Sequence, residues 1–194
     1  MPARYDSFAK NYDRCFAPLE RIGLAKMRQE AISLLPKNAR ILELGCGAGA
    51  NFQFYPKCEL AVSSELSIEM ISVAKTKRRE NLLSQADAHS LPFGEAEFDA
   101  AFATLVFCSI PEPELAFGEI RRVLRPGGRV VMLEHVRPDN VLGPFFDLLN
   151  KATVAFADDH FNRRTAVTAR NCGLKIIEVR RKLFGIVNLI VCEV

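Results

Sequence analysis

The chain has 194 residues and a formal net charge of +3, and 49% of its residues are hydrophobic. A chain of this length is expected to form a single domain, here residues 1–194, because domains usually contain about 100–200 residues. So small a net charge does not favour a nucleic-acid partner, and we expect none.

The six cysteines are scattered through the chain, with no Cys-x-x-Cys pair. This usage is typical of the reducing cytosol rather than of a disulfide-rich secreted protein, and it predicts no metal site. No apolar run approaches the roughly 18 residues of a membrane span. Residues 1–6 also lack the apolar core of a signal peptide. We therefore expect a cytoplasmic protein.

Residues 1–38 precede the first predicted strand and are expected to form a helical lid. Tyr5 and Tyr12 are seven positions apart, so a helix would place them on one face. They form either a cap over the core or a lid whose rings close over a ligand. A second helix is predicted over Pro18–Leu35, with Arg28 on its polar face. It either packs on the core or lies on a membrane surface.

A glycine-rich stretch follows this N-terminal region. The apolar run at 41–44 predicts a buried parallel strand, and Gly45, Gly47 and Gly49 come directly after it. Glycines at this density allow a tight turn and a close approach to a ligand. Residues 51–55 predict the start of a helix whose free N–H groups face the loop. Strand, glycine loop and helix together are typical of the nucleotide-binding corner of a doubly wound sheet.

The remaining elements alternate along the chain. Further strands are predicted at residues 59–65, 82–85, 98–104, 129–136, 174–180 and 187–194, and further helices at 66–79, 114–124 and 165–171. Only residues 181–186 separate the last two strands, which permits an antiparallel pair and excludes a crossover helix. The predicted fold is α/β, with a Rossmann-like seven-stranded, mostly parallel sheet, helices on both faces and an antiparallel last strand.

Three acidic residues lie at the ends of predicted strands: Glu43, Glu65 and Asp87. The carboxyl ends of parallel strands meet at one edge of a sheet, where ligands bind. Glu43 would suit an ammonium group, Glu65 would suit the hydroxyls of a ribose, and Asp87 would suit an exocyclic amine. S-adenosylmethionine carries all three groups. The alternative is a dinucleotide, read from Gly45-x-Gly47-x-x-Ala50. Its phosphates would be repelled by Glu43.

The motifs resemble those of the class I S-adenosylmethionine-dependent methyltransferases, in the same order and over nearly the whole chain. The similar stretches are Glu43–Gly49 (glycine loop), Glu65–Met70 (ribose-binding strand end), Asp87–Phe93 (adenine-contacting motif), and residues 98–99 and 122–128 (two later signatures). Within the class, the chain resembles the branch of quinone-biosynthesis, phospholipid N- and alkyl-thiol methyltransferases.

This resemblance implies an enzyme that moves the methyl group of S-adenosylmethionine to a thiol, amine or quinol of a small molecule or lipid by in-line displacement. It also implies peripheral membrane contact. The residues implied to bind the donor are Tyr5, Tyr12, Glu43, Gly45, Cys46, Gly47, Gly49, Glu65, Leu66, Met70, Asp87, Ala88, Thr104 and Leu105. The rival functions are a minimal NAD(P)-dependent oxidoreductase and a non-catalytic interaction protein.

Residues 137–164 interrupt the alternation and are expected to form an acceptor-side insert. His160, oriented by Asp159, is the first candidate for a general base, because histidine titrates in the useful range. His135 follows a buried strand and is the second. Either histidine could instead be structural, the first in a solvated loop and the second in the core.

Overall fold

The computed structural model describes residue 6, residues 9–139, residue 141, residues 143–144, 146–148, residue 150, residue 160 and residues 163–194. The predicted site residues Tyr5 and Asp159 lie outside these residues. The helical segments are α1 (Ala9–Leu19), the π-helical η1 (Glu20–Leu24), α2 (Ala25–Ser33), the 3-10 helix η2 (Phe52–Phe54), α3 (Ile68–Lys75), α4 (Pro113–Val123), α6 (Thr165–Asn171) and the 3-10 helix η3 (Leu183–Gly185).

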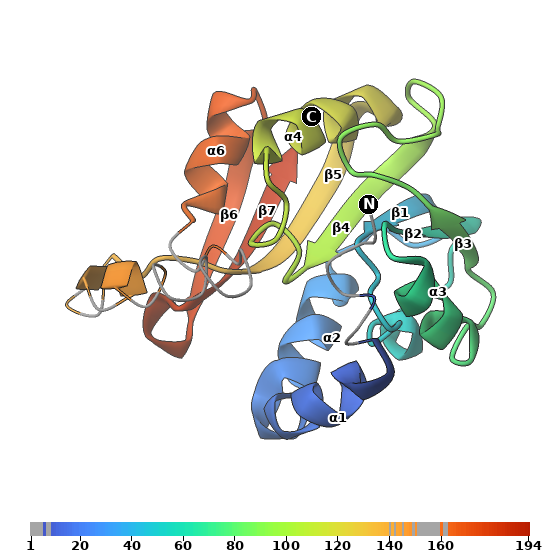
Figure 1. Ribbon diagram of the computed structural model, residues 1–194. Helices are drawn as coiled ribbons and strands as arrows, with labels where there is room; N and C mark the ends of the chain where they lie inside the picture. The colour runs from blue at the N-terminus through green and yellow to red at the C-terminus, as the bar shows by residue number, and fades with distance from the viewer. Residues whose placement is uncertain are drawn as a thin grey trace.

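A seven-stranded sheet crosses the structure (Figure 1). Its strands are β1 (Arg40–Leu44), β2 (Leu60–Glu65), β3 (Leu82–Gln85), β4 (Phe98–Thr104), β5 (Leu124–His135), β6 (Lys175–Lys182) and β7 (Val187–Glu193). Their order is β3-β2-β1-β4-β5-β7-β6, with β7 antiparallel to both of its neighbours. The predicted Rossmann-like fold with an antiparallel last strand is confirmed.

Side chains that alternate along the strands face two different helical layers. Leu42 and Leu44 of β1 pack in one cluster with Phe117 and Ile120 of α4. Ile41 packs on the opposite face, in a cluster that contains Ala31 and Ile32 of α2. This is the period of two expected of a strand that is buried on both faces. Figure 1 shows α4 and α6 at the top of the sheet and α2 below it.

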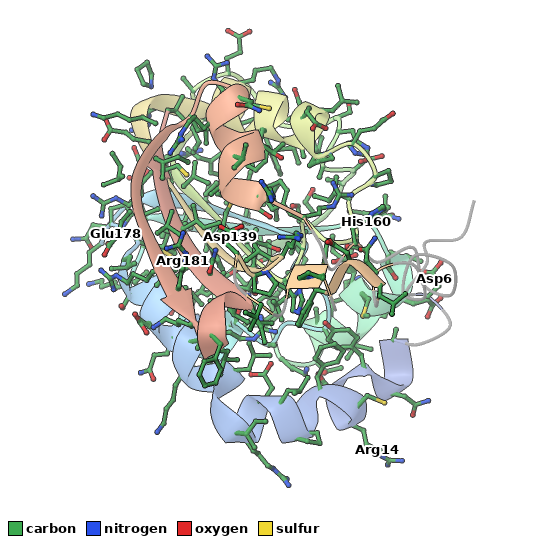
Figure 2. All side chains as sticks on the ribbon, turned by 90° about the vertical axis from the view of Figure 1, so that its left-hand side faces the viewer. Asp6, Arg14, Asp139, His160, Glu178 and Arg181 are labelled. Atoms are coloured by element: carbon green, nitrogen blue, oxygen red, sulfur yellow. The ribbon has the colours of Figure 1, made fainter. Side chains whose placement is uncertain are left out.

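The segment that follows β5 passes beside the hairpin formed by β6 and β7. Arg181 of β6 lies 3.8 Å from the carboxylate of Asp139, and both are seen on the near side of Figure 2. The backbone N–H of Val136 donates to the carbonyl of Ile186 at 2.9 Å. The beginning of the predicted insert is therefore fixed to the antiparallel end of the sheet.

Two helix predictions are wrong. Residues 51–55 do not start a long helix, because η2 ends at Phe54 and Tyr55 is extended at φ −57° and ψ 134°. Pro56 disfavours the helical conformation of the residue before it. Pro18 does not begin a separate helix either, since it lies inside α1 and the chain bends later, at Gly23 (φ 145°).

The fifth strand begins earlier than predicted. Leu124 already pairs with Phe98 of β4, and the regular pairing resumes at Arg129 opposite Ala100. The register shifts between Phe98 and Ala100, so the Pro-Gly-Gly segment is accommodated as an irregularity in the strand.

Candidate functional site

A cavity of about 680 Å³ lies at the carboxyl ends of the four strands β1 to β4. Its lining comes from the loops that follow these strands and from the N-terminal segment. The lining residues are Asp6, Tyr12, Gly45, Gly47, Ser64–Ile68, Met70, Gln85–His89, Leu105, Val106 and Ser109–Pro111. The strand order reverses between β1 and β4, and ligands of open α/β sheets bind at such a switch point.

The glycine loop forms the floor of this cavity. Gly45 has φ +60°, and a Cβ at this position would lie 2.7 Å from Cγ1 of Val106. Any larger residue would therefore collide with the loop after β4, as well as adopting an unfavourable conformation. The backbone N–H of Gly47 donates to Glu65 at 2.9 Å, which ties the loop to the end of β2.

Glu65 presents its carboxylate to the cavity from the last position of β2. Its Oε1 accepts a hydrogen bond from the N–H of Ser67, and its Oε2 accepts one from Gly47, each at 2.9 Å. Burial raises the pKa of Glu65, and these backbone hydrogen bonds oppose the rise. Each carboxylate oxygen can accept a further hydrogen bond. The group is thus held in a fixed orientation with acceptor capacity left over.

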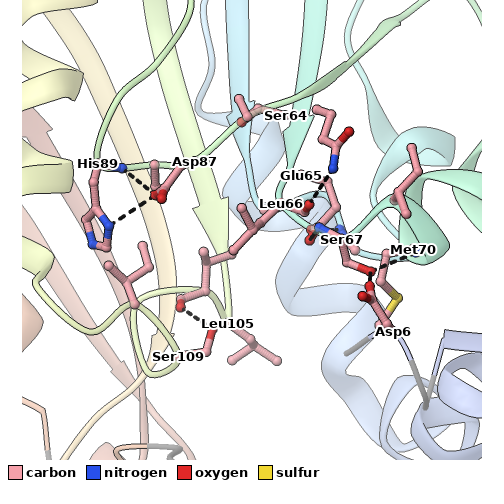
Figure 3. A pocket seen from close by; sticks show the side chains of 18 of the residues that line it. Asp6, Ser64, Glu65, Leu66, Ser67, Met70, Asp87, His89, Leu105 and Ser109 are labelled. Carbon is pink, nitrogen blue, oxygen red and sulfur yellow. Dashed lines mark hydrogen bonds and ion pairs between the residues drawn. The ribbon is translucent and has the colours of Figure 1, made fainter. Parts of the chain in front are cut away.

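Asp87 and His89 line the opposite side of the cavity (Figure 3). Oδ1 of Asp87 accepts a hydrogen bond from the backbone N–H of His89 at 2.9 Å and lies 3.1 Å from its Nδ1. The imidazole therefore fixes the carboxylate in place. The sequence interpretation placed Asp87 at this edge and gave His89, in the same loop, only a structural role.

The N-terminal segment closes one side of the cavity. Asp6 accepts a hydrogen bond from the hydroxyl of Ser67, and Ser67 also caps α3 by accepting from the N–H of Met70 at 3.1 Å. Tyr12 of α1 lines the cavity and stacks on Phe16 at a ring-centroid distance of 4.4 Å. Burial raises the pKa of Tyr12 to about 12. Tyr12 therefore belongs to the wall of the cavity, and its contact with a ligand stays a prediction.

The loop after β4 is held from behind by Glu134. This side chain is fully buried, and its two oxygens accept hydrogen bonds from the N–H groups of Val106 (3.1 Å) and Phe107 (3.2 Å). Leu105 adopts a positive φ of 59°, which is uncommon for a residue with a side chain. Because Leu105 lines the cavity, Glu134 stabilises a strained part of its wall.

Glu43 lies behind the glycine loop rather than in the cavity lining. It is fully buried, and its carboxylate accepts hydrogen bonds from Nδ2 of Asn51 (2.6 Å) and from the hydroxyl of Tyr55. Burial raises its pKa, and the hydrogen bonds together with the charge of Arg28 oppose this rise. The predicted contact of Glu43 with a ligand ammonium group would therefore require this network to open.

Three more of the residues predicted to bind the methyl donor are enclosed. Cys46 is 4% exposed, and burial raises the pKa of its thiol, which favours the packing interpretation. A Cβ on Gly49 would lie 2.6 Å from the ring of Phe52. Thr104 is buried and bonded to Asn51 at 2.8 Å. The structure thus gathers nine predicted residues in the lining: Tyr12, Gly45, Gly47, Glu65, Leu66, Met70, Asp87, Ala88 and Leu105.

The two candidate bases lie outside the cavity lining. His135 ends β5, and its ring lies 5.5 Å from that of Phe146. The backbone N–H of His160 donates to the carbonyl of Cys108 at 3.0 Å. In Figure 2, His160 is seen toward the side of Asp6 and away from Glu178. His160 therefore sits beside the loop that ends in Ser109, which does line the cavity.

The charge of the cavity is one-sided. Its charged lining residues in the described part of the chain are Asp6, Glu65 and Asp87, joined by His89, and neither lysine nor arginine is among them. Such a lining favours a ligand that carries positive charge and disfavours phosphate groups. Within the same part of the chain, no cluster of three or more His, Cys, Asp or Glu residues is arranged for a metal ion.

Several contributors were not identified from the sequence. Arg28, Asn51 and Glu134 all lie behind the cavity wall, and His89 lies within the wall. The contact between His89 and Asp87 could have been predicted from the sequence, because the two residues are only two positions apart. The others depend on contacts between distant segments.

A family model described as "Methyltransferase domain" matches residues 42–132 of the chain. Similar proteins include the thiol S-methyltransferase TMT1B of Mus musculus, at 36% identity over 51% of this chain and 43% of that protein. They also include the demethylmenaquinone methyltransferase of Renibacterium salmoninarum, at 30% identity over 75% and 62%. The phosphatidylethanolamine N-methyltransferase of Cereibacter sphaeroides is 31% identical over 66% and 64%. The chain spans less than two thirds of the length of each.

The fold is shared with solved structures over its whole length. An S-adenosylmethionine-dependent methyltransferase from Thermotoga maritima superposes with a TM-score of 0.77, over 100% of this chain and 99% of the other, at 21% identity. At this identity the likeness concerns the fold alone.

Proposed function

Because the chain belongs to the class I S-adenosylmethionine-dependent methyltransferases, we propose that it transfers the methyl group of S-adenosylmethionine to a thiol, amine or quinol. The observation that carries this proposal is the cavity at the β1–β4 switch point, whose lining in the described chain holds three carboxylates and neither lysine nor arginine. The donor has a sulfonium, an ammonium and a carboxylate, so it is a net cation that suits this lining.

The lining offers a partner for each part of the donor. The spare acceptor capacity of Glu65 suits the two hydroxyls of a ribose. Asp87, fixed by His89, suits the exocyclic amine of adenine from the opposite wall. Gly45 and Gly47 bring backbone close to the ligand between them. In this proposal the sugar and the base are held from opposite walls of the cavity.

The same features disfavour a dinucleotide. A pyrophosphate needs a cationic or N–H-rich cradle, and the helix that would present its N–H groups here is reduced to the three residues of η2. Glu65, whose carboxylate already occupies the N–H of Gly47, would repel it. The NAD(P)-dependent alternative is therefore not supported by the described site.

Methyl transfer requires little of the protein beyond the alignment of the methyl donor with the acceptor. Methyl transfer from a sulfonium is an in-line displacement with a good leaving group, and placing two reactants correctly can supply about 7–11 kcal/mol of the barrier. We assign this alignment to the cavity wall formed by Tyr12 and Leu105, which lies between the N-terminal segment and the end of β4. A base is required only for an acceptor that is protonated at the working pH.

We assign acceptor selection to residues 137–164. Two members of this segment contact the loop that lines the cavity: His160 through the carbonyl of Cys108, and Arg163 through the carbonyl of Ile110 at 2.5 Å. The relatives named above act on a thiol, a demethylmenaquinone and phosphatidylethanolamine. We therefore propose a small-molecule or lipid acceptor, with His160 and then His135 as candidate bases.

Peripheral membrane contact is part of the same proposal. No helix in the described part of the chain is long and apolar enough to cross a bilayer. Large apolar side chains are nevertheless exposed at Ile22 (82%), Val141 (92%) and Leu183 (54%). Such side chains could meet the surface of a membrane that holds a lipid acceptor.

The test is donor binding followed by turnover. Calorimetry with S-adenosylmethionine and, separately, with NAD⁺ should show binding of the first and not of the second. Release of S-adenosylhomocysteine would then be measured with a thiol, an amine, a quinol and phosphatidylethanolamine vesicles. Binding of NAD⁺ without binding of S-adenosylmethionine would refute the proposal.

A further inference from the structure

Arg28 is an arginine of the N-terminal helices that is enclosed behind the glycine loop. It is 3% exposed, although the sequence places it on the polar face of its helix. Its Nε donates to Glu20 at 2.9 Å, and its Nη1 donates to Oδ1 of Asn51 at 3.2 Å and to the hydroxyl of Thr104. A guanidinium stays charged and must be paired when it is buried. Arg28 therefore joins α2 to the end of the glycine loop and to the end of β4.

The side-chain amide of Asn51 connects Arg28 to Glu43. Its oxygen accepts from Arg28, while its nitrogen donates to Glu43 at 2.6 Å and to Thr104 at 2.8 Å. The reverse orientation would set an N–H₂ group against the guanidinium and an oxygen against the carboxylate. The amide therefore has one orientation as long as Arg28 and Glu43 both carry their charges.

We propose that Arg28 is a positioning residue of the candidate donor site, which holds the glycine loop and the end of β4 in place through Asn51 and Thr104. Asn51 closes the loop that contains Gly45 and Gly47, and Thr104 immediately precedes Leu105. None of Arg28, Asn51 and Thr104 lines the cavity. Their effect on a ligand is therefore transmitted through the backbone of residues that do.

Arg28 also supplies a positive charge that acts on the buried Glu43. The other groups that face Glu43 are Tyr55, Ser63 and Asn51, and its charge in turn raises the pKa of Cys46. Without Arg28, an ionised Glu43 would be a buried charge without a counter-ion, which proteins tolerate poorly. Since burial already raises the pKa of Glu43, loss of Arg28 would favour its neutral form and disturb the amide orientation.

The first measurement needs no ligand. Hydrogen exchange would be followed in Arg28→Met and in the control Arg180→Met, which removes the arginine that links α2 to the sheet through Glu30, 3.2 Å away. We expect residues 45–51 and 104–107 to exchange about tenfold faster in Arg28→Met, with little change in the control. Faster exchange spread evenly over β1–β7, or none in residues 45–51, would overturn the proposal.

Two further variants keep this test decisive if Arg28→Met does not fold. Arg28→Lys keeps the charge but cannot reproduce the planar set of three contacts. The pair Arg28→Met with Glu43→Gln removes both charges together. We expect residues 45–51 to exchange faster in Arg28→Lys than in the wild type, and more slowly in the double variant than in whichever single variant of Arg28 folds. No improvement would show that Arg28 acts on stability alone.

The second measurement rests on the proposed function. Calorimetry should show a dissociation constant for S-adenosylmethionine about tenfold higher or more in Arg28→Met than in the wild type. The ratio to the wild type should be smaller in the double variant, because it holds no ionised Glu43 left without Arg28. A wild type that binds no donor would refute the proposed function, while the exchange data would still decide the role of Arg28.

Discussion

The backbone N–H of Gly47 donates to Oε2 of Glu65 at 2.9 Å, so the glycine loop and the end of β2 form one hydrogen-bonded unit. The other oxygen of the same carboxylate accepts from Ser67, at the start of α3. A single side chain thus organises three backbone segments that meet at the cavity. Changes to it should affect ligand binding more than they affect the sheet.

Glu65→Gln should weaken donor binding strongly. A glutamine has one acceptor oxygen, so the N–H of Gly47 or of Ser67 loses its partner and the ribose loses an acceptor. Hydrogen bonds to charged groups contribute about 1.5–3 kcal/mol, so the dissociation constant should rise about 10- to 100-fold. Calorimetry would measure this change, with Glu69→Gln, an exposed residue in the first turn of α3, as the control. Equal donor affinity in both variants would show that Glu65 does not contribute to donor binding.

Donor affinity should fall on acidification while the protein stays folded. Burial raises the pKa of Glu65 above its ordinary value of about 4.3. The contribution of such a group to stability is fully present below its unfolded pKa and is lost as the pH rises through its folded pKa. Protonating Glu65 therefore does not unfold the chain, but it removes the acceptor. Calorimetry and circular dichroism over the same pH range would separate the two effects, and Glu65→Gln should lack this step in affinity.

Gly45→Ala and Gly47→Ala should have different consequences. At Gly45 the new Cβ would lie 2.7 Å from Val106 and the φ of +60° is unfavourable as well, so we expect the free energy of unfolding to drop by about 2–5 kcal/mol. At Gly47 no heavy atom lies within 4 Å, so the positive φ of 53° should cost only about 1–2 kcal/mol. The methyl group would still narrow the cavity and weaken donor binding. Denaturant unfolding and calorimetry test both. Val106→Ala should restore part of the stability lost in Gly45→Ala, because it removes the contact but not the unfavourable φ, and it should restore none in Gly47→Ala.

Glu134→Gln should loosen the loop after β4. The carboxylate accepts from the N–H groups of Val106 and Phe107, and a glutamine can serve only one of them without turning its own N–H₂ toward the other. A buried donor without a partner costs about 1–3 kcal/mol, and we expect that loss in the free energy of unfolding together with weaker donor binding. Glu193→Gln, at the far end of β7, is the control for denaturant unfolding. A matching loss in both variants would contradict a local role for Glu134.

The strands were predictable because the sequence signals are local. Residues 59–65, 82–85 and 98–104 are short runs bounded by polar, glycine or proline residues, and the structure gives strands at Leu60–Glu65, Leu82–Gln85 and Phe98–Thr104. The antiparallel pairing of β6 and β7 followed from the short link between them. Glu65 and Asp87 lie on the cavity wall because parallel strands end at a common edge.

The buried network behind the loop was not predictable in the same way. Arg28 meets Asn51 across 23 positions and Thr104 across 76, and neither spacing leaves a trace in the local pattern. The sequence interpretation placed Arg28 on the polar face of its helix, yet that arginine is enclosed. Glu43 was placed at the correct strand end, but the sequence could not show that Asn51 and Tyr55 already occupy its oxygens.

The shortness of η2 has an electrostatic consequence. A macrodipole builds up as peptide dipoles align over several turns, and the helical segment after the glycine loop contains only three residues, Phe52–Phe54. This corner therefore generates little of the positive potential with which related folds attract phosphates. The preferred ligand charge is set by individual carboxylates instead, so exchanging one or two of them should be enough to alter which small molecules this corner admits.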